Sequence, residues 1–89
     1  MTERDLEIIN RLGLHARAAA KLVHTAGRFA CDVRLIKEGE EVDAKSILGL
    51  MALGAAQGTQ VSIVCDGKDE DEAIEAISQL IGDRFGEDA

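Results

Sequence analysis

Two kinds of hydrophobic pattern take turns along this chain of 89 residues. In four short stretches apolar and polar residues alternate, which is typical of strands with one buried face. In three longer stretches apolar residues recur every three or four positions, which is typical of helices with one buried stripe. The predicted strands are residues 6–10, residues 29–37, a short stretch around Val42, and residues 59–66. The predicted helices are residues 16–26, residues 44–54, and a stretch that follows the acids at 69–72 and ends near residue 81.

Glycines and one serine mark the ends of these elements. Gly13 permits a turn before the first helix, and we expect Gly27 to end that helix. The second helix has Ser46 at its N-cap and Gly54 at its C-terminal end. Residues 38–40 supply a tight turn, so the second and third strands should form a hairpin.

The order strand, helix, strand, strand, helix, strand, helix predicts the fold. Because the hairpin connection is short and the helices can share one face, we expect an antiparallel sheet covered on one side. The predicted class is α+β, an open-faced two-layer α/β sandwich of βαββαβα order with a four-stranded antiparallel sheet and three helices on one face. Residues 1–89 have room for one core and form a single domain, with residues 82–89 as a fraying polar tail. The residues expected in the core are Leu6, Ile8, Ala19, Leu22, Val23, Ala26, Cys31, Val33, Leu35, Leu50, Leu53, Val61, Ile63, Cys65, Ala73, Ile74, Ile77, Leu80 and Ile81.

Charge and cysteine content exclude several classes of function. The net charge of −7 and the absence of a Lys/Arg-rich run argue against binding to nucleic acid or to an anionic membrane surface. No stretch has the length of a membrane span and the chain begins without signal-peptide features, so we expect a cytoplasmic protein. Cys31 and Cys65 are interpreted as reduced core residues. The alternative, a zinc site that joins them to His15 and His24, matches no common zinc spacing, and we expect no metal site.

The stretch Gly13-Leu14-His15-Ala16-Arg17 stands at the predicted start of the first helix. The first amides of a helix have no intrahelical partner, and with the aligned peptide dipoles they attract an anion. Imidazole is a poor N-cap, so the amides of Ala16, Arg17 and Ala18 are expected to stay open for a phosphate group. A lone histidine at such a junction is more often a surface or capping residue. The turn glycine before it and the arginine after it favour the chemical role.

A row of cations follows the same helix. Arg17, Lys21, His24 and Arg28 are spaced by four, three and four residues, which places them along one side. In an acidic protein this row indicates a surface for docking a partner. The alternative is a solvated helix face whose last cations complement the helix dipole.

The second helix has more apolar residues than one side can bury. If Leu50 and Leu53 face the core, Leu48 and Met51 lie on another face, with Ile47 at the boundary. These three residues would then form a small exposed patch. Methionine also fills gaps in cores, so the sequence leaves both interpretations of this patch open.

The His15 stretch, together with residues 45–54, resembles the HPr family, the histidine phosphocarriers of the bacterial phosphoenolpyruvate-dependent phosphotransferase system. The resemblance spans almost the whole chain. It implies that His15 takes a phosphoryl group from Enzyme I and passes it to an EIIA-type domain of a sugar transporter. It also implies that Arg17 binds the phosphate and that Ser46 is a regulatory phosphorylation site.

The resemblance further implies a monomer that needs no cofactor, because metal ions and the first transfer belong to the donor enzyme. An HPr kinase/phosphorylase and a transcriptional regulator are further expected partners. The docking residues would be Lys21, His24, Arg28, Ile47, Leu48 and Met51.

One departure concerns the helix start, where the family usually has proline and this chain has Ala18. Alanine also forms helices well, so the first turn should survive with less rigidity. The nitrogen-related NPr-like phosphorelay proteins share the His15 motif and are the alternative assignment, as is a mainly regulatory module that binds a partner. The segment Lys45-Ser46-Ile47 is more similar to HPr. A small ligand-binding module is a third alternative, for which the sequence offers no sign of a pocket.

Overall fold

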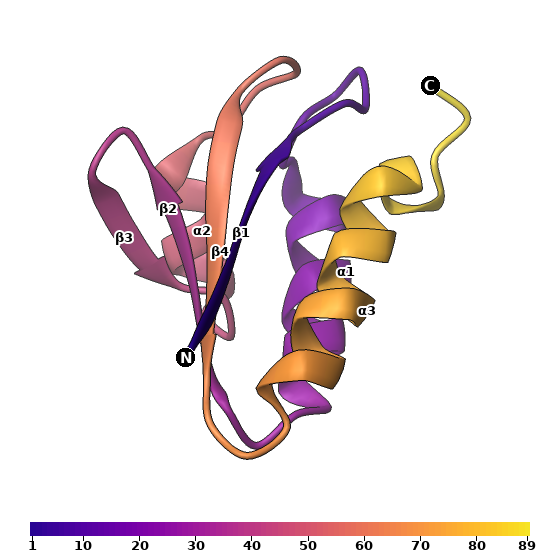
Figure 1. The fold of residues 1–89 in the computed structure, drawn as a ribbon. Helices are drawn as coiled ribbons and strands as arrows, with labels where there is room; N and C mark the ends of the chain where they lie inside the picture. Colours follow the sequence, from indigo (N-terminus) through magenta and orange to yellow (C-terminus); the bar gives the residue numbers. More distant parts are fainter.

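The computed structural model describes residues 1–89, which form one four-stranded antiparallel sheet and three α-helices (Figure 1). The elements in chain order are β1 (Thr2–Glu7), α1 (Ala16–Gly27), β2 (Asp32–Lys37), β3 (Glu40–Asp43), α2 (Ile47–Leu53), β4 (Gln60–Asp66), α3 (Glu70–Gly82) and the 3₁₀ turn η1 (Arg84–Gly86). The predicted order and the predicted fold class are confirmed.

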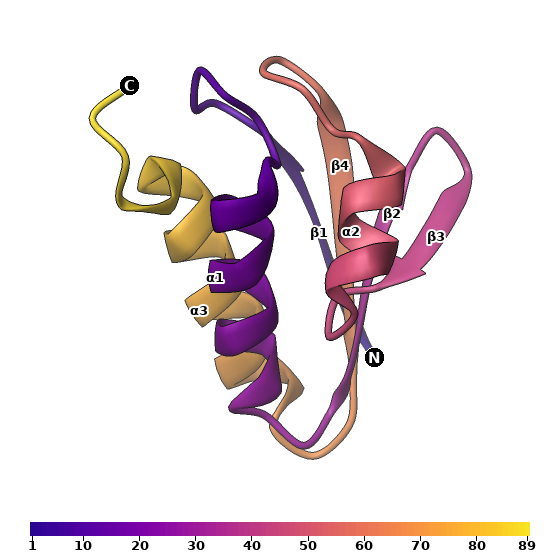
Figure 2. The same ribbon diagram turned by 180° about the vertical axis from the view of Figure 1, so that it is seen from behind.

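The sheet has the strand order β1-β4-β2-β3, and every neighbouring pair is antiparallel. α3 packs on β1 and β4, α2 packs on β3, and α1 contacts both of the other helices. Figures 1 and 2 show α1 and α3 side by side, with α2 nearer to β2 and β3. The other face of the sheet has no helix over it, and the outward positions of its strands are mostly polar.

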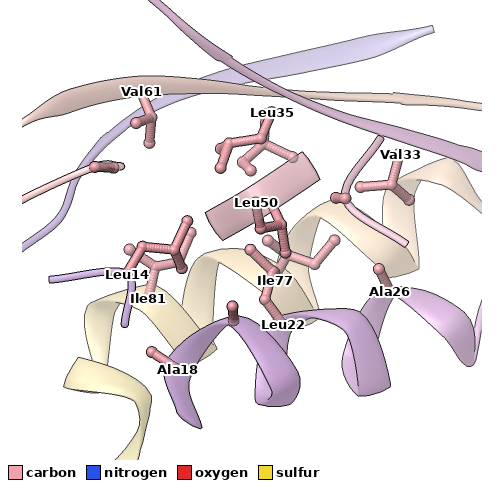
Figure 3. Close-up of a cluster of buried hydrophobic side chains, with 14 of the residues drawn as sticks. Leu14, Ala18, Leu22, Ala26, Val33, Leu35, Leu50, Val61, Ile77 and Ile81 are labelled. Atoms are coloured by element: carbon pink, nitrogen blue, oxygen red, sulfur yellow. The ribbon is translucent and has the colours of Figure 1, made fainter. Parts of the chain in front are cut away.

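The core lies between the sheet and the helices (Figure 3). Strand β2 turns Val33 and Leu35 inward, and β4 turns Val61 and Ile63 inward, as their alternation predicts. Leu22 from α1, Leu50 from α2 and Ile77 from α3 meet them and are fully buried. Of the stripe expected on α1, Val23 is only half-buried, and Ala18 takes a buried place.

Strand β1 begins earlier than its hydrophobic pattern predicts. Its inward positions include Arg4, whose guanidinium donates to Ser78 Oγ at 3.0 Å and to Glu75 Oε1 at 2.6 Å. Because a charged residue occupies an inward position of β1, the alternation of apolar and polar residues is not visible in this part of the sequence. The strand ends at Glu7, although Ile8 and Asn10 beyond it are still buried.

The caps of α2 are those that the sequence predicts. Ser46 Oγ accepts a hydrogen bond from the Gly49 amide at 3.2 Å, and Gly54 ends the helix with a left-handed φ of 65°. The predicted stop of α1 at Gly27 is confirmed, although the glycine does not form a left-handed cap. Gly27 is the last helical residue, and Arg28 caps the helix in a right-handed conformation.

The prediction that residues 82–89 form a fraying tail is wrong. Residues 84–86 form the turn η1 against α3, and Phe85 inside this turn is fully buried. The chain end lies at the same end of the molecule as the loop between β1 and α1 (Figures 1 and 2). None of the helices combines the length and the apolarity needed to cross a membrane.

Candidate functional site

His15 is the N-cap residue of α1. Its backbone is extended, with φ −76° and ψ 178°, and its carbonyl accepts the first helical hydrogen bond from the Ala19 amide at 2.8 Å. The ring makes no capping bond. The amides of Ala16, Arg17 and Ala18 therefore have no backbone or capping partner. Three amide N–H donors and the nitrogens of one imidazole ring therefore lie within the first turn of the helix. The amides can bind an anion there.

The loop before His15 is pressed against the end of α2. Gly13 has a φ of 66°, and a Cβ at this position would lie 2.7 Å from the Ala55 carbonyl oxygen. Only glycine fits both conditions. The Leu14 amide donates to the same Ala55 oxygen at 2.8 Å, and Asn10 Nδ2 donates to the Gly13 oxygen at 2.8 Å. The position of His15 is thus set by the backbone on both sides of it.

The carboxylate of Glu87 lies against the His15 ring. Its Oε2 contacts His15 Nε2, and its Oε1 accepts from Asn10 Nδ2 at 3.0 Å. The two side chains are 25% and 14% exposed, His15 first. The hydrogen bond from Asn10, followed by the one from His15, lowers the pKa of Glu87 below its ordinary value. Glu87 is therefore a carboxylate near neutral pH and can accept a hydrogen bond from Nε2–H.

Three further contacts hold the chain end in this place. Phe85 is buried, Lys21 Nζ donates to the Phe85 carbonyl at 2.6 Å, and the Arg11 amide donates to the Ala89 carbonyl at 3.1 Å. Sequence reasoning missed this whole arrangement. One signal was available, because Phe85 is one of only two aromatic residues in the chain and stands in an otherwise polar stretch.

Arg17 is exposed and has no ion pair. It borders a cavity of about 220 Å³ whose lining residues are Arg11, Leu12, Arg17, Glu87, Asp88 and Ala89. A guanidinium without a carboxylate partner can turn toward an anion attached to the neighbouring histidine.

Helices α1 and α2 are antiparallel neighbours. Lys45 Nζ donates to the Phe29 carbonyl at 2.8 Å, which ties the start of α2 to the end of α1. The bond between Leu14 and Ala55 ties their other ends. Ser46 therefore lies one helix length from His15, about 10 Å for seven residues at 1.5 Å each. The structure places Ser46 and His15 on one pair of helices but not in one pocket.

The other residues predicted for docking face outward from these two helices, with one exception. His24 and Arg28 are exposed, and Ile47, Leu48 and Met51 are 42%, 79% and 43% exposed. Lys21 is the exception, because it is half-buried and bound to Phe85. Leu12, which the sequence pattern did not single out, adds an exposed apolar side chain beside the cavity next to Arg17.

The cysteines and the acidic run lie at the opposite end of α1. Cys31 and Cys65 are free and buried, and burial, followed by a hydrogen bond with Asp69, raises the pKa of the Cys31 thiol to about 12. Asp69 accepts from the amides of Ala30 and Cys31 at 2.8 and 2.9 Å. The first acid of the run thus binds the backbone before β2. No three His, Cys, Asp or Glu side chains are grouped as metal ligands.

This small α+β domain has a half-buried histidine at an open helix N-terminus, next to an arginine without an ion pair. These features define a class of small domains suited to carrying an anionic group on imidazole. The family described as "PTS HPr component phosphorylation site" matches residues 2–83. The phosphocarrier protein HPr of Cupriavidus necator is 53% identical over 87 residues, which are 98% of each chain. The structure of an HPr from Thermoanaerobacter tengcongensis covers all of both chains with 46% identity and a TM-score of 0.97.

A second structure from that organism, described as an HPr dimer, is 47% identical over 98% of this chain and all of its own, with a TM-score of 0.79. This chain belongs to the HPr family of phosphotransferase-system phosphocarriers. Membership implies partners of that system such as Enzyme I and EIIA.

Proposed function

We propose that this protein accepts a phosphoryl group on His15 from phosphorylated Enzyme I and donates it to an EIIA-type domain of a sugar transporter. The observation that carries the proposal is the position of His15 at the N-cap of α1, with three unpartnered amides beside it. An enzyme that completes a reaction needs a substrate pocket. A carrier needs only a nucleophile and donors for the phosphoryl oxygens, because its partner encloses the reaction.

The nucleophile is Nδ1 of His15. Its ring partner Nε2 faces Glu87, so the proton of the neutral imidazole resides on Nε2 and the lone pair on Nδ1. Nδ1 is also the ring nitrogen nearer to the backbone, because it is bonded to the ring carbon that carries Cβ. A bond forms between Nδ1 and phosphorus, while the bond from phosphorus to the donor breaks and leaves its electron pair on the donor.

The phosphoryl oxygens are bound by the amides of Ala16, Arg17 and Ala18 and by the Arg17 guanidinium. The helix dipole contributes about 0.3–1 kcal/mol to this binding, and up to about 2 kcal/mol in a partly buried site. Such modest stabilisation suits a protein that must release its cargo. The three amides include that of Ala18, which a proline at this position would lack.

Partners dock on the surface formed by α1 and α2 around His15. The exposed cation Arg28 attracts acidic partners, with the His24 ring beside it as a polar contact. Ile47, Leu48 and Met51 exclude water from the complex. Lys21 contributes charge to this surface while it holds the chain end. The same surface serves Enzyme I and the EIIA-type domain in turn.

Regulation acts through Ser46. An HPr kinase/phosphorylase would add about −1.5 to −2 charges at the start of α2, next to the apolar docking residues. This charge would weaken docking of acidic partners and offer a new contact to a transcriptional regulator. The free, buried cysteines suit a reducing compartment, and the protein is proposed to act as a monomer in the cytoplasm. One relative is described as a dimer, so the oligomeric state should be measured by sedimentation at several protein concentrations.

The test of the proposed function is the intact mass of the protein after incubation with phosphoenolpyruvate and Enzyme I. Wild-type protein should gain one phosphoryl group and lose it in acid, because a phosphorus–nitrogen bond is acid-labile. H15A should gain none, whereas H24A should still reach one group per molecule at the end point. Acid-stable phosphate, or equal uptake by H15A, would contradict the proposal.

A further inference from the structure

The contact between Glu87 and His15 is built by several independent features of the fold. The chain reaches Glu87 through three consecutive residues with left-handed φ, Arg84 at 56°, Phe85 at 55° and Gly86 at 76°. Two of these are not glycines, so the turn is costly for the backbone. Burial of Phe85 and its carbonyl bond from Lys21 offset that cost. A strained turn held at both its side chain and its backbone indicates that the position of Glu87 is specific.

Asn10 links Glu87 to the loop that carries His15. It is fully buried, and its Nδ2 group is shared between the Gly13 carbonyl at 2.8 Å and Glu87 Oε1 at 3.0 Å. Its Oδ1 is buried without a hydrogen-bond partner. A buried amide with an unsatisfied oxygen is unfavourable for stability. Asn10 is therefore better explained by the two groups that it holds together than by its own contribution to the core.

From these contacts we propose that Glu87 is a positioning residue for phosphoryl transfer. It keeps the Nε2–H tautomer of His15, so that Nδ1 always presents its lone pair, and it balances the positive charge of the ring after phosphorylation. The inference rests on the proposed function. It goes beyond it in assigning a role to the chain end, which the histidine motif does not contain.

The charge balance follows from the chemistry of imidazole. When Nδ1 forms its bond to phosphorus, Nε2 keeps its proton and the ring becomes a cation. The carboxylate at Nε2 stabilises that cation, as a charge-assisted hydrogen bond. The lowered pKa of Glu87 keeps this carboxylate ionised in both states of the carrier. When the phosphoryl group leaves, the electron pair returns to Nδ1 and the Nε2 proton has not moved.

The experiment measures two properties of wild-type protein, E87Q and E87A. The first is the tautomer of the His15 ring, from its ¹⁵N chemical shifts at a pH where the ring is neutral. The second is the rate of phosphoryl uptake from Enzyme I. The control D83N removes an exposed acid from the same end of the chain, at a residue whose side chain makes no hydrogen bond or ion pair. It matches the change of charge in E87Q.

Wild-type protein and D83N should show the Nε2–H tautomer and equal uptake rates. E87A should show a mixture of tautomers and a rate lower by roughly ten- to a hundredfold, the effect of losing a hydrogen bond to a charged group. E87Q has one oxygen left, which can accept from Nε2 only if the hydrogen bond from Asn10 is given up. It should therefore favour the Nε2–H tautomer more than E87A does, and should have an intermediate rate because the negative charge is gone. A merely structural role would not separate these two variants in the ¹⁵N spectra.

The proposal is overturned if E87A keeps the wild-type tautomer, or if E87A and E87Q take up phosphate as fast as D83N. E87Q keeps the shape of the side chain and one of its two accepting oxygens. Urea denaturation of both variants excludes unfolding as the cause of a lower rate. Failure of the proposed function would appear differently, as wild-type protein that gains no phosphate. The ¹⁵N spectra would then still decide whether Glu87 sets the tautomer.

Discussion

Arginine side chains in this protein fall into paired and unpaired groups. Arg4 is bound to Glu75, and Arg34 donates to Asp32 at 2.9 Å, a bond that raises the pKa of Arg34 above its ordinary value. Arg17 has no such partner, although acids outnumber bases by 17 to 10 in the chain. An unpaired guanidinium two residues from His15 is available for an incoming phosphoryl group.

Replacement of this guanidinium should slow the carrier. R17A removes a charge-assisted hydrogen bond of about 1.5–3 kcal/mol, so we expect phosphoryl uptake from Enzyme I to fall by roughly ten- to a hundredfold. R17K should recover part of the rate, since lysine keeps the charge but not the planar fork. The matched control is R34A, which loses the same charge from the open face of the sheet. Equal rates for R17A and R34A would contradict a role for Arg17.

Helix α2 has the caps and the exposed apolar patch that the sequence pattern suggests. Ser46 caps it, Gly54 ends it, and the side chains between them divide into buried Leu50 and Leu53 and the exposed patch. The cap is a structural role that Ser46 has in any case. Regulation, if it acts here, must change charge without removing the cap.

Three substitutions of Ser46 separate these two roles. S46A loses the cap and should lower the free energy of unfolding by about 1 kcal/mol, measured by urea denaturation. S46N and S46D keep a capping oxygen and should stay close to wild-type stability. Of these two, only S46D should slow phosphoryl uptake from Enzyme I, because its charge lies at the docking surface. Equal uptake by S46N and S46D would show that charge at this position has no effect.

At the scale of the whole molecule, charge is distributed unevenly. The outward positions of the strands include Glu3, Asp5, Asp43 and Asp66, whereas the exposed side of α1 carries cations. A protein with a net charge of −7 can therefore still attract an acidic partner from one side. The electrostatic field of the protein would then orient an approaching partner toward the α1 side before the two surfaces touch.

This distribution predicts the effect of charge reversal on association. R28E should lower the association rate with Enzyme I several-fold at low ionic strength and make that rate less sensitive to salt. R34E makes the same change of charge on the open face of the sheet and should have a much smaller effect. Stopped-flow measurement of both variants over a range of salt concentrations checks this. Identical rates for the two would contradict steering by the α1 side.

The sequence by itself was sufficient for most of the elements, their order, the fold class and the histidine motif. Alternation in β2 and β4, the period of α1 and α3, and the caps Ser46 and Gly54 are local properties, because each depends on neighbours a few residues away. It was also sufficient to place His15 at a helix start. It failed for β1, where Arg4 occupies an inward position and interrupts the pattern.

Only the tertiary structure decided what surrounds the histidine. Glu87 lies 72 residues from His15 in the chain, and no periodicity relates them. Their contact depends on the packing of α3 beside α1, on the burial of Phe85, and on a turn whose left-handed residues have no sequence signature beyond one glycine. The same packing brings Lys21 to the Phe85 carbonyl, so that this lysine binds the end of the chain and is not free in solvent. Local propensity places His15 at the start of a helix, whereas long-range packing brings a carboxylate against its Nε2.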